Sequence, residues 1–358
     1  MRLTAIAAPD SSGHYRIRQP IEQLQSQGVE GLEVLSALPV EFNRGEPIGV
    51  YTDADVVLIQ RPMLHFMPGV IDVLHRQGTK VIIDLDDDFH TAHADNIAFQ
   101  LNHPRRSRLQ NWHHLTACVR KADLITVSTD QLARRYGSHR RVAVVRNCVD
   151  DDWLDIKHRG DGRTLGWAGT VLNHPTDLQA TRGGVAMALA DHPEWRFVCI
   201  GGAKYVDRVQ AGLELPYTPE ATDWKPLELH SLLVSSLDVG IVPLADTLFN
   251  AAKSWLKGIE YAALGIPFVA SDLPEYRLLR ERHGLGELAT PKARSWRRRL
   301  GAIMELDGLR KEYAEWSRDR VRTYLTVSRN AWRWQEVWEA VTMSRQRWAL
   351  SPTPTVQS

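Results

Sequence analysis

Short apolar runs alternate with longer helical patterns along most of this chain, and this alternation restricts the fold more than any other feature. A short apolar run bounded by turn residues is typical of a strand that is buried on both faces, and the helical segments between such strands connect parallel neighbours. The alternation therefore predicts strand–helix–strand units around parallel sheets, which is an α/β fold. The predicted strands are residues 3–7, 56–59, 81–83, 124–127, 142–145, 164–167, 195–200, 239–242 and 268–270.

The predicted strands form two series, separated by a polar segment with the sequence DDDWLDIKHRGDGR (residues 150–163). This segment contains glycine and lacks apolar periodicity, so we interpret it as a linker between two domains. The predicted organisation is a first domain over 1–150, a linker over 151–163, a second domain over 164–325, a C-terminal helix over 326–350 and a disordered tail over 351–358.

Composition excludes several classes of protein. The chain of 358 residues is 43% hydrophobic and 24% charged, as expected of a soluble globular protein, and its net charge of +1 gives no general reason to expect nucleic acid. Its three cysteines, Cys118, Cys148 and Cys199, are far apart in the sequence and match neither a disulfide framework nor a zinc motif. No apolar run approaches the ~20 residues of a membrane-spanning helix, and we expect a cytoplasmic protein without an integral membrane segment.

The segment from 249 to 275 carries the most specific local pattern. A helix over 253–264 would place Lys253, Lys257 and Glu260 on one charged stripe and apolar residues on another. Gly265 suits the left-handed position that ends a helix, and Pro267 prevents its continuation before the strand at 268–270. Two ammonium groups and a carboxylate so arranged fit an anion with a hydroxylated tail, such as a nucleoside diphosphate. The alternative is a solvated helix surface with an i,i+3 ion pair worth about 0.3 kcal/mol.

This segment resembles the donor-binding helix of the group 1 family of retaining glycosyltransferases, which have the two-domain GT-B fold. Other motifs similar to that family occur in the same order along the chain. They are GHYRIRQP at 13–20, DLDDDF at 84–89, ADLITVST at 122–129, RNCVD at 146–150 and GWAGT at 166–170, the last followed by His174 and Asp177.

The resemblance implies two facing Rossmann-like domains, with a C-terminal helix that crosses back to the first domain and packs there through tryptophans, among them Trp332, Trp334, Trp338 and Trp348. It implies transfer of a sugar from a nucleotide-diphosphate sugar to an acceptor hydroxyl with retained configuration, without a metal and with no cofactor beyond the donor substrate. The acceptor, whether glycan, lipid, protein or modified nucleic acid, is not specified. The donor-binding residues that the resemblance implies are Gly169, Thr170, His174, Lys253, Ser254, Lys257 and Glu260, with Lys253 also counted as catalytic.

The acidic run Asp84, Asp86, Asp87 and Asp88 follows a predicted inner strand, and therefore lies at the carboxyl edge of a sheet, where such folds build their sites. It could bind a metal, act on the acceptor, or cap the next helix. We favour the acceptor side, with Asp86 and Asp87 as catalytic residues. The resemblance adds Gly13, His14, Tyr15 and Arg16 as acceptor-binding residues, while a packed or exposed histidine is an equal alternative for His14.

The chain departs from the wider family where a glutamate is often found, because Ala252 stands there. This departure makes a catalytically silent binding or scaffold protein an alternative, and a nucleotide-sugar epimerase is retained as a second alternative because it shares the fold. Dinucleotide-binding and phosphate-loop glycine motifs are absent from the sequence. A basic cluster over 292–299 is interpreted as a solvated helix face, with weak peripheral membrane contact or nucleic-acid binding as alternatives.

Overall fold

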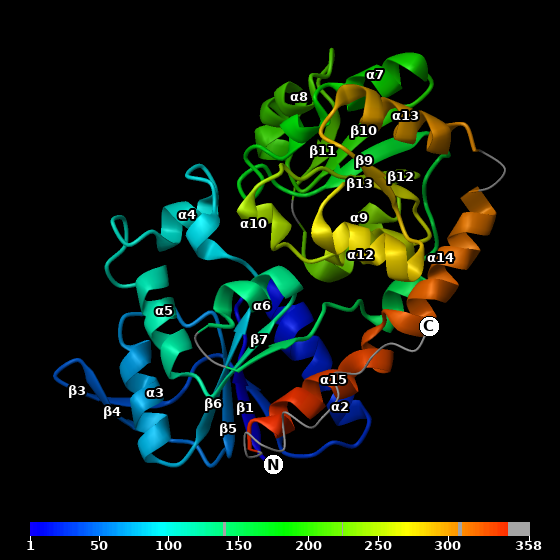
Figure 1. The fold of residues 1–358 in the computed structure, drawn as a ribbon. Helices are drawn as coiled ribbons and strands as arrows, with labels where there is room; N and C mark the ends of the chain where they lie inside the picture. Colours follow the sequence, from blue (N-terminus) through cyan, green and yellow to red (C-terminus); the bar gives the residue numbers. More distant parts are fainter. Residues whose placement is uncertain (139–140, 224, 307–309, 343–358) are drawn as a thin grey trace. The chain divides into compact units, whose positions relative to one another are not determined.

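The computed structural model describes residues 1–138, 141–223, 225–306 and 310–342, and it divides into two compact units (Figure 1). Unit 1 contains Met1–Asp86, His103–Arg146 and the described residues from Asn330 onward, whereas unit 2 contains Asp87–Asn102 and Asn147–Arg329. Each unit is built around its own parallel sheet, so the predicted α/β architecture with two Rossmann-like domains is confirmed. Within the part of the chain that the structure describes, no helix is both long and apolar enough to cross a membrane.

Unit 1 contains a six-stranded parallel sheet in the order β2-β1-β5-β6-β7-β8. Its inner strands are largely buried, and β5 and β7 are buried along their whole length, as expected when helices cover both faces of a parallel sheet. An antiparallel hairpin, β3–β4, lies outside the sheet. The strands of unit 1 are β1 (Leu3–Ile6), β2 (Leu32–Leu35), β3 (Val40–Asn43), β4 (Glu46–Val50), β5 (Val56–Gln60), β6 (Lys80–Leu85), β7 (Leu124–Val127) and β8 (Val142–Val144).

Helices α5 and α6 of unit 1 begin where polar side chains cap them. Asn111 accepts hydrogen bonds from the first backbone amides of α5, and Thr129 does the same for α6. Trp334 and Trp338 of α15 are buried, with the guanidinium carbon of Arg16 5.8 Å from a ring centroid of Trp334. The helical elements are α1 (Ser11–Gly13), the π-helix η1 (His14–Arg18), α2 (Gln19–Ser26), α3 (Met67–Arg76), α5 (Trp112–Lys121), α6 (Asp130–Tyr136) and, from Asn330 onward, α15 (Val327–Ala340).

Unit 2 contains a second six-stranded parallel sheet, in the order β11-β10-β9-β12-β13-β14. Alternate residues of β10 enter two different apolar cores: Phe197 and Cys199 pack into one, whereas Val198 and Ile200 pack into the other. The sheet is therefore buried on both faces. Its strands are β9 (Thr164–Ala168), β10 (Arg196–Ile200), β11 (Glu220–Thr222), β12 (Val239–Val242), β13 (Phe268–Ser271) and β14 (Glu287–Ala289).

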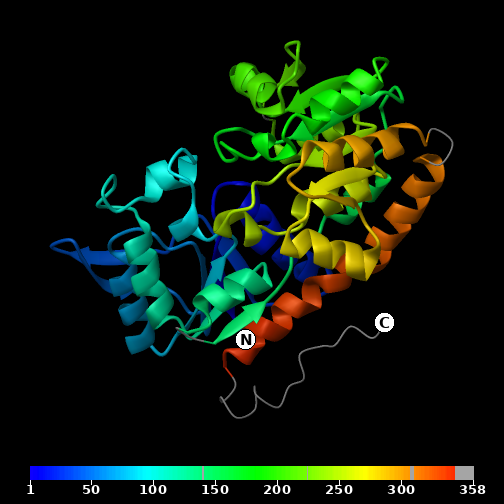
Figure 2. The same cartoon turned by 45° about the horizontal axis from the view of Figure 1, so that its top comes forward.

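Helices α7 and α13 pack side by side on one face of this sheet (Figures 1 and 2). A Cβ atom on Gly184 of α7 would lie 2.5 Å from the carbonyl oxygen of Ala293 and 2.6 Å from Cβ of Trp296, so only glycine fits there. The helical elements of unit 2 are η2 (Phe89–Thr91), α4 (Ile97–Asn102), η3 (Asp151–Asp155), η4 (Leu178–Thr181), α7 (Gly184–Asp191), η5 (Ala203–Tyr205), α8 (Val206–Leu213), α9 (Leu227–Val234), α10 (Leu248–Ala251), α11 (Leu256–Ala263), α12 (Pro274–His283), α13 (Ala293–Met304), α14 (Arg310–Tyr324) and the start of α15.

All nine predicted strands are present, and the sequence patterns missed β2, β3, β4, β11 and β14. These five are short or mostly exposed, so they lack the apolar run that marks the inner strands. The predicted tail at 351–358, the last part of the predicted C-terminal helix and Trp348 lie outside the described residues.

Two predicted domain boundaries are wrong. Residues 87–102 belong to unit 2 rather than to the first domain, because the backbone amide of Ile97 donates to the carbonyl of Leu172 (2.9 Å) and Asn96 Nδ2 donates to the carbonyl of Asn173 (2.7 Å). The predicted linker, residues 151–163, is part of unit 2, since Trp153 and Leu154 are buried in a core of that unit.

The predicted helix over 253–264 is shorter than expected. Helix α11 begins at Leu256, and residues 252–255 form a non-helical connection from α10. Lys253 is therefore not on the helical stripe of Lys257 and Glu260, contrary to the prediction. At the other end, Gly265 has a φ of +75° and ends the helix before β13, as predicted.

Candidate functional site

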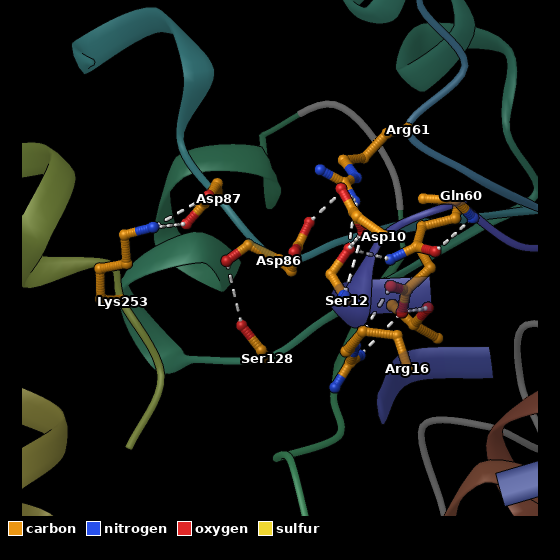
Figure 3. Close-up of polar contacts among 12 residues, drawn as sticks. Asp10, Ser12, Arg16, Gln60, Arg61, Asp86, Asp87, Ser128 and Lys253 are labelled. Atoms are coloured by element: carbon orange, nitrogen blue, oxygen red, sulfur yellow. Dashed lines mark hydrogen bonds and ion pairs between the residues drawn. The ribbon is translucent and has the colours of Figure 1, made fainter. Parts of the chain in front are cut away.

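Polar side chains gather in unit 1 where neighbouring parallel strands end (Figure 3). Asp10 lies in the loop after β1, Arg61 directly follows β5, Asp86 directly follows β6, and Ser128 directly follows β7. The carboxyl ends of parallel strands share one edge of the sheet, and folds of this type bind their ligands at that edge.

Arg61 is the centre of this group. Its Nη2 lies 2.7 and 2.8 Å from the two carboxylate oxygens of Asp10, its Nε lies 3.4 Å from Oδ1 of Asp86, and it donates to the Ser12 hydroxyl. Its backbone has a φ of +49°, a conformation that non-glycine residues adopt at a cost of about 1–3 kcal/mol and that is concentrated at functional sites. The structure thus holds one guanidinium between two carboxylates at the sheet edge.

The protonation of Asp10 follows from these contacts. Burial favours the neutral form of its carboxyl group, but the charge of Arg61 and the hydrogen bonds from Ser12 and Arg61 outweigh burial and lower the pKa of Asp10. Gln60 extends the same network, because its Nε2 donates to Ser12 Oγ (3.2 Å) and its Oε1 accepts from the amide of Ala8 (2.9 Å). The loop after β1 is therefore held by hydrogen bonds to two neighbouring residues, Gln60 and Arg61.

The four residues predicted to bind the acceptor do not lie together on a surface. Gly13 is buried under the loop after β1, where a Cβ atom would lie 1.9 Å from the carbonyl oxygen of Ala8. His14 opens the π-helical turn η1 and is half-buried, whereas Tyr15 is 1% exposed. A π-helical turn is rare and is often found at functional sites.

Arg16 is completely buried, so its predicted contact with an acceptor is wrong. Its Nε and Nη2 lie 3.1 and 2.7 Å from the carboxylate oxygens of Asp84, and it also donates to the carbonyl of Val145. Thr126 Oγ1 donates to the same carboxylate at 2.7 Å. Arg16 thus ties η1 to the inner strands, and its role is structural.

The acidic run after β6 is divided among four different basic partners. Asp84 pairs with Arg16, Asp86 with Arg61, Asp87 with Lys253, and the Asp88 carboxylate lies 3.7 Å from Nδ1 of His90. The four carboxylates therefore diverge, whereas a divalent cation requires several oxygen ligands that converge. Among the described residues, no group of three or more histidine, cysteine or acidic side chains is arranged to hold a metal ion.

In unit 2, the loop after β9 begins with Gly169 and Thr170 and leads to a buried polar network. His174 Nδ1 lies 2.7 Å from Oδ2 of Asp177, whose Oδ1 accepts hydrogen bonds from Asn250 Nδ2 (2.5 Å) and from the backbone amide of Ala245 (2.9 Å). Asp177 is 3% exposed. This carboxylate therefore joins the loops after β9 and β12 to α10, and it orients the imidazole of His174.

Gly169 is needed for packing rather than only for the approach of a ligand. A Cβ atom at this position would lie 2.5 Å from the indole of Trp167, and its backbone amide donates to the carbonyl of Ile200 (2.8 Å). Thr170 Oγ1 accepts from the amide of Leu172 at 3.3 Å and so stabilises the turn that leads to His174.

Lys253 lies in the connection between α10 and α11. Its ammonium group is 2.9 and 3.0 Å from the two carboxylate oxygens of Asp87 (Figure 3) and 4.5 Å from the ring centroid of Phe249. The neighbouring Ser254 accepts a hydrogen bond from Asn147 Nδ2 (3.0 Å), and Trp255 Nε1 donates to the carbonyl of Asn147 (3.0 Å). Asn147 thus holds Ser254 and Trp255, the two residues that directly follow Lys253, through hydrogen bonds.

Glu260 is buried on α11, so the alternative of a wet surface ion pair is wrong for this residue. Its side chain is 6% exposed, and Lys257 Nζ lies 3.6 Å from its Oε2. The Glu260 charge is one cause, after burial itself, of the raised pKa of Tyr276. A carboxylate that is buried beside a basic residue is more typical of a binding site than of a solvated surface.

A pocket of about 590 Å³ opens beside His174 in unit 2. Its walls come from α4 and the nearby Asp95, from the loop after β9 and η4, and from α8. The lining residues are Asp95, Ile97, Gln100, Val171, Leu172, His174, Pro175, Leu178, Gln179, Arg208, Ala211 and Gly212. A volume between about 300 and 1,000 Å³ is usual for a small-molecule site.

Sequence reasoning missed Asp10, Arg61, Asn147 and Asn250. Asp10 and Arg61 could have been found, since both follow predicted inner strands, which is the argument that singled out the acidic run. Asn147 and Asn250 carried no such signal, because their importance depends on hydrogen bonds to Ser254 and Asp177, residues distant in the sequence.

No family model matches this sequence, and no curated protein matches it. Its structure is similar to the pneumococcal O-GlcNAc transferase GtfA in complex with UDP and GlcNAc (12% identity, 85% of this chain and 65% of that one, TM-score 0.56). It is also similar to sucrose-phosphate synthase from Thermosynechococcus elongatus (13% identity, 98% and 100%, TM-score 0.63). A third similar structure is HepE from Anabaena in complex with UDP and glucose (12% identity, 94% and 99%, TM-score 0.61).

The chain thus covers two of these three proteins almost completely and spans 65% of the length of GtfA. At such low identity the similarity concerns the fold. The fold of this chain is the GT-B fold of glycosyltransferases, with two Rossmann-like units.

Proposed function

We propose that this protein is a glycosyltransferase that moves a sugar from a nucleotide-diphosphate sugar to an acceptor hydroxyl. The observation that carries the proposal is that charged side chains gather at the carboxyl edges of the parallel strands in both units of a GT-B fold. Two solved structures with this fold, GtfA and HepE, contain UDP and a sugar. Neither function nor ligand follows from fold alone, so the site residues carry the rest of the argument.

On the donor side, we assign the diphosphate to Lys253 and the nucleoside hydroxyls to Glu260. Negative charge accumulates on the diphosphate as the glycosidic bond breaks, and a fixed ammonium group stabilises that charge. At about 4 Å and an effective dielectric constant of 20, the attraction is ~4 kcal/mol. Asn147 supports this assignment, since its hydrogen bonds hold the side chains of Ser254 and Trp255, the two residues that follow Lys253. Gly169, Thr170, His174, Ser254 and Lys257 complete the proposed donor site.

On the acceptor side, we assign the sheet edge of unit 1 that contains Asp10, Arg61 and Asp86. The Asp10 and Asp86 carboxylates can accept hydrogen bonds from sugar hydroxyls, and Arg61 orients both through its ion pairs. His14, at the start of the π-helical turn, is retained as a further acceptor contact. Asp87 is retained as a residue of the reaction through its contact with Lys253.

We further propose retention of configuration and membership of the group 1 family, which the motifs at 13–20, 84–89 and 249–267 support. The diphosphate leaving group would assist removal of the proton from the acceptor hydroxyl. We propose that no metal and no cofactor are required, which the divergence of the four aspartates supports. A cytoplasmic location agrees with a nucleotide-sugar substrate.

Two alternatives make different predictions. A nucleotide-sugar epimerase of this fold would release a free sugar without an acceptor, whereas a silent scaffold protein would bind the nucleotide without turnover. Ala252 is 4% exposed. It lacks a carboxylate whether the protein is a transferase, an epimerase or a scaffold, so this residue alone does not distinguish the three functions.

A two-step experiment tests the proposal. Nucleotide sugars are first screened by thermal shift, since a ligand that binds only the native state raises the unfolding temperature. The ligand that binds is then incubated with the protein, with and without a mixture of sugar, polyol and lipid-linked acceptors, and the products are identified by mass spectrometry. Acceptor-dependent release of nucleoside diphosphate supports the transferase. Release of a free sugar that is independent of acceptor indicates the epimerase, and binding without turnover indicates the scaffold.

A further inference from the structure

A second feature of unit 1 lies apart from the sheet edge. From His103 to Lys121 the sequence contains four arginines, one lysine and three histidines but no acidic residue. The first half of this stretch, residues 103–111, is an irregular connection that precedes α5. An acid-free basic segment is unusual in a chain whose net charge is only +1.

This connection runs beside the residues that precede α3. Leu64 and Gln110 form an antiparallel bridge, the amide of His65 donates to the carbonyl of Leu109 (2.8 Å), and the amide of Asn111 donates to the carbonyl of Met63 (2.9 Å). The pairing places Leu64 and His65 beside Leu109, and three exposed arginines precede Leu109 in the same connection. We name these six residues the rim patch: Leu64, His65, Arg105, Arg106, Arg108 and Leu109.

The rim patch exposes apolar and basic groups together. Leu109 is 64% exposed and Leu64 is 39% exposed, and the three arginines are exposed. Phe42 of β3, 46% exposed, extends the apolar part because its ring lies 5.2 Å from that of Phe66, the next residue after His65. Large apolar side chains that remain in water beside fixed positive charges are typical of a surface that docks on an anionic lipid layer.

The second basic cluster, over residues 292–299, does not share these properties. Arg297 makes a two-pronged ion pair with Asp191 (2.5 and 2.6 Å), and Arg299 pairs with Glu287 (2.9 Å). The apolar residue at its centre, Trp296, is completely buried. Part of the positive charge of the cluster over 292–299 is therefore neutralised, and the large apolar side chain in this cluster is not exposed for insertion into a bilayer.

We propose that the rim patch docks unit 1 on the surface of an anionic bilayer, with Leu109 and Leu64 inserted at the level of the headgroups and the three arginines beside acidic lipids. The exposed leucines favour lipid over nucleic acid, which is bound through phosphate contacts and base stacking rather than aliphatic insertion. This docking is independent of the proposed sugar transfer, because no residue of the rim patch is assigned to the donor or acceptor.

The size of the effect follows from the charge. One basic residue near an anionic surface strengthens binding by about fivefold, so three arginines together contribute about 100-fold. Salt weakens this contribution because it screens exposed charges. Insertion of Leu109 adds about another fivefold.

The test is co-sedimentation with two kinds of vesicle, one of phosphatidylcholine alone and one of an equimolar mixture of phosphatidylcholine and phosphatidylglycerol. The wild-type protein is expected to bind the mixed vesicles at low salt, to bind less at high salt, and to bind phosphatidylcholine weakly. Replacement of Arg105, Arg106 and Arg108 by glutamine should reduce binding to mixed vesicles by about 100-fold, and Leu109→Gln should reduce it by about fivefold.

The matched control removes the same charge from the other cluster: Lys292→Gln, Arg294→Gln and Arg298→Gln together. All positions are exposed, so thermal unfolding should be unchanged in both triple variants. Equal loss of binding in the two triple variants would show a general charge effect and overturn the proposal. A second result would also overturn the proposal. If Leu109→Gln left vesicle binding unaltered and the protein bound an RNA oligonucleotide tightly through Arg105, the patch would be assigned to nucleic acid.

Discussion

The Lys253 ammonium group lies 2.9 and 3.0 Å from the two carboxylate oxygens of Asp87. The cation that we propose to bind phosphate is therefore paired with a carboxylate of the protein itself. Both side chains are about four-fifths buried, at 21% and 18% exposure, and this protects the pair from screening. A donor diphosphate that binds Lys253 has to share this cation with Asp87 or displace it.

Lys253→Ala and Asp87→Asn should therefore change nucleotide binding in opposite directions. Loss of Lys253 should reduce donor use by about 100-fold, the usual cost of one lost contact to a developing anion. Asp87→Asn removes the competing charge and should tighten binding of the matching nucleoside diphosphate by about tenfold, equivalent to ~1.4 kcal/mol. Calorimetric titration measures both. Weaker binding by Asp87→Asn would show that the carboxylate positions Lys253 rather than competes for it.

Glu260→Gln should mainly weaken nucleotide binding, by about 10- to 100-fold, because a charge-assisted contact from a carboxylate to a diol is worth ~1.5 to 3 kcal/mol. The loss should be the same for the free nucleoside diphosphate and for the intact donor, and titration of each compares them. Lys257→Met measures the contribution of Lys257 separately, since it removes the ion pair at 3.6 Å but keeps the Glu260 carboxylate. Equal affinities of Glu260→Gln and wild type would remove Glu260 from the donor site.

The buried network around Asp177 predicts separate effects on stability and activity. Asp177→Asn replaces a carboxylate that accepts from Asn250, Ala245 and His174, and should lower the free energy of unfolding by about 2–3 kcal/mol. His174→Asn removes one of these contacts from a half-buried position, so it should lower donor turnover while unfolding changes by less than ~1 kcal/mol. Urea denaturation and initial rates distinguish them. A large stability loss with unchanged turnover in His174→Asn would make this histidine structural.

Activity should survive extensive chelation, because each aspartate of the acidic run is paired with its own basic residue. The measurement is the transfer rate after dialysis against a chelator, with and without added Mg²⁺ or Mn²⁺. Loss of activity that a divalent ion restores would instead assign a metal role to this run.

His158 predicts a pH dependence of stability. Its hydrogen bond to Asp238 raises its pKa above the ordinary value against the opposing effect of burial, and Nε2 lies 3.3 Å from Oδ1 of Asp238 and 3.0 Å from the carbonyl of Leu237. Since the folded pKa is higher than the unfolded one, the stabilisation is complete below about pH 6.5 and is lost as pH rises through the folded pKa. His158→Gln should therefore be more destabilising at pH 5 than at pH 9, by at most about 1 kcal/mol because the side chain is 40% exposed. Denaturation at both pH values tests this, with equal losses contradicting it.

The inner strands of both sheets could be predicted from the sequence because each is largely buried and contains a short, mostly apolar run, as in β5 and β12. Edge strands such as β2 and β11 could not, since their residues are partly exposed and their pairing depends on a neighbour distant in the sequence. The same limit applies to helix ends. Helix α11 starts at Leu256, directly after Ser254 and Trp255, and the hydrogen bonds of these two residues to the distant Asn147 are not visible in the local sequence.

Candidate site residues divided in a similar way. Lys253, Glu260, Asp86 and Asp87 were identified by type and position, and the structure gives each a charged partner. The predicted surface role of Arg16 failed because its partner, Asp84, belongs to the acidic run and lies inward on β6. Whether a charged side chain faces a ligand or the core depends on strand register, which a sequence motif does not contain.

The contact between Arg16 and Trp334 joins residues near opposite ends of the chain, and Arg141 Nη2 likewise donates to the carbonyl of Ala340 (2.9 Å). During synthesis, the ribosome delivers the first two segments of unit 1 long before the end of α15 exists. All six strands of the first sheet lie within residues 3–144, so the nascent chain contains that sheet without the part of α15 from Asn330 onward while unit 2 is still being translated. Contacts between segments so distant in the sequence slow folding, so we expect unit 1 to reach its native packing only after α15 has been synthesised.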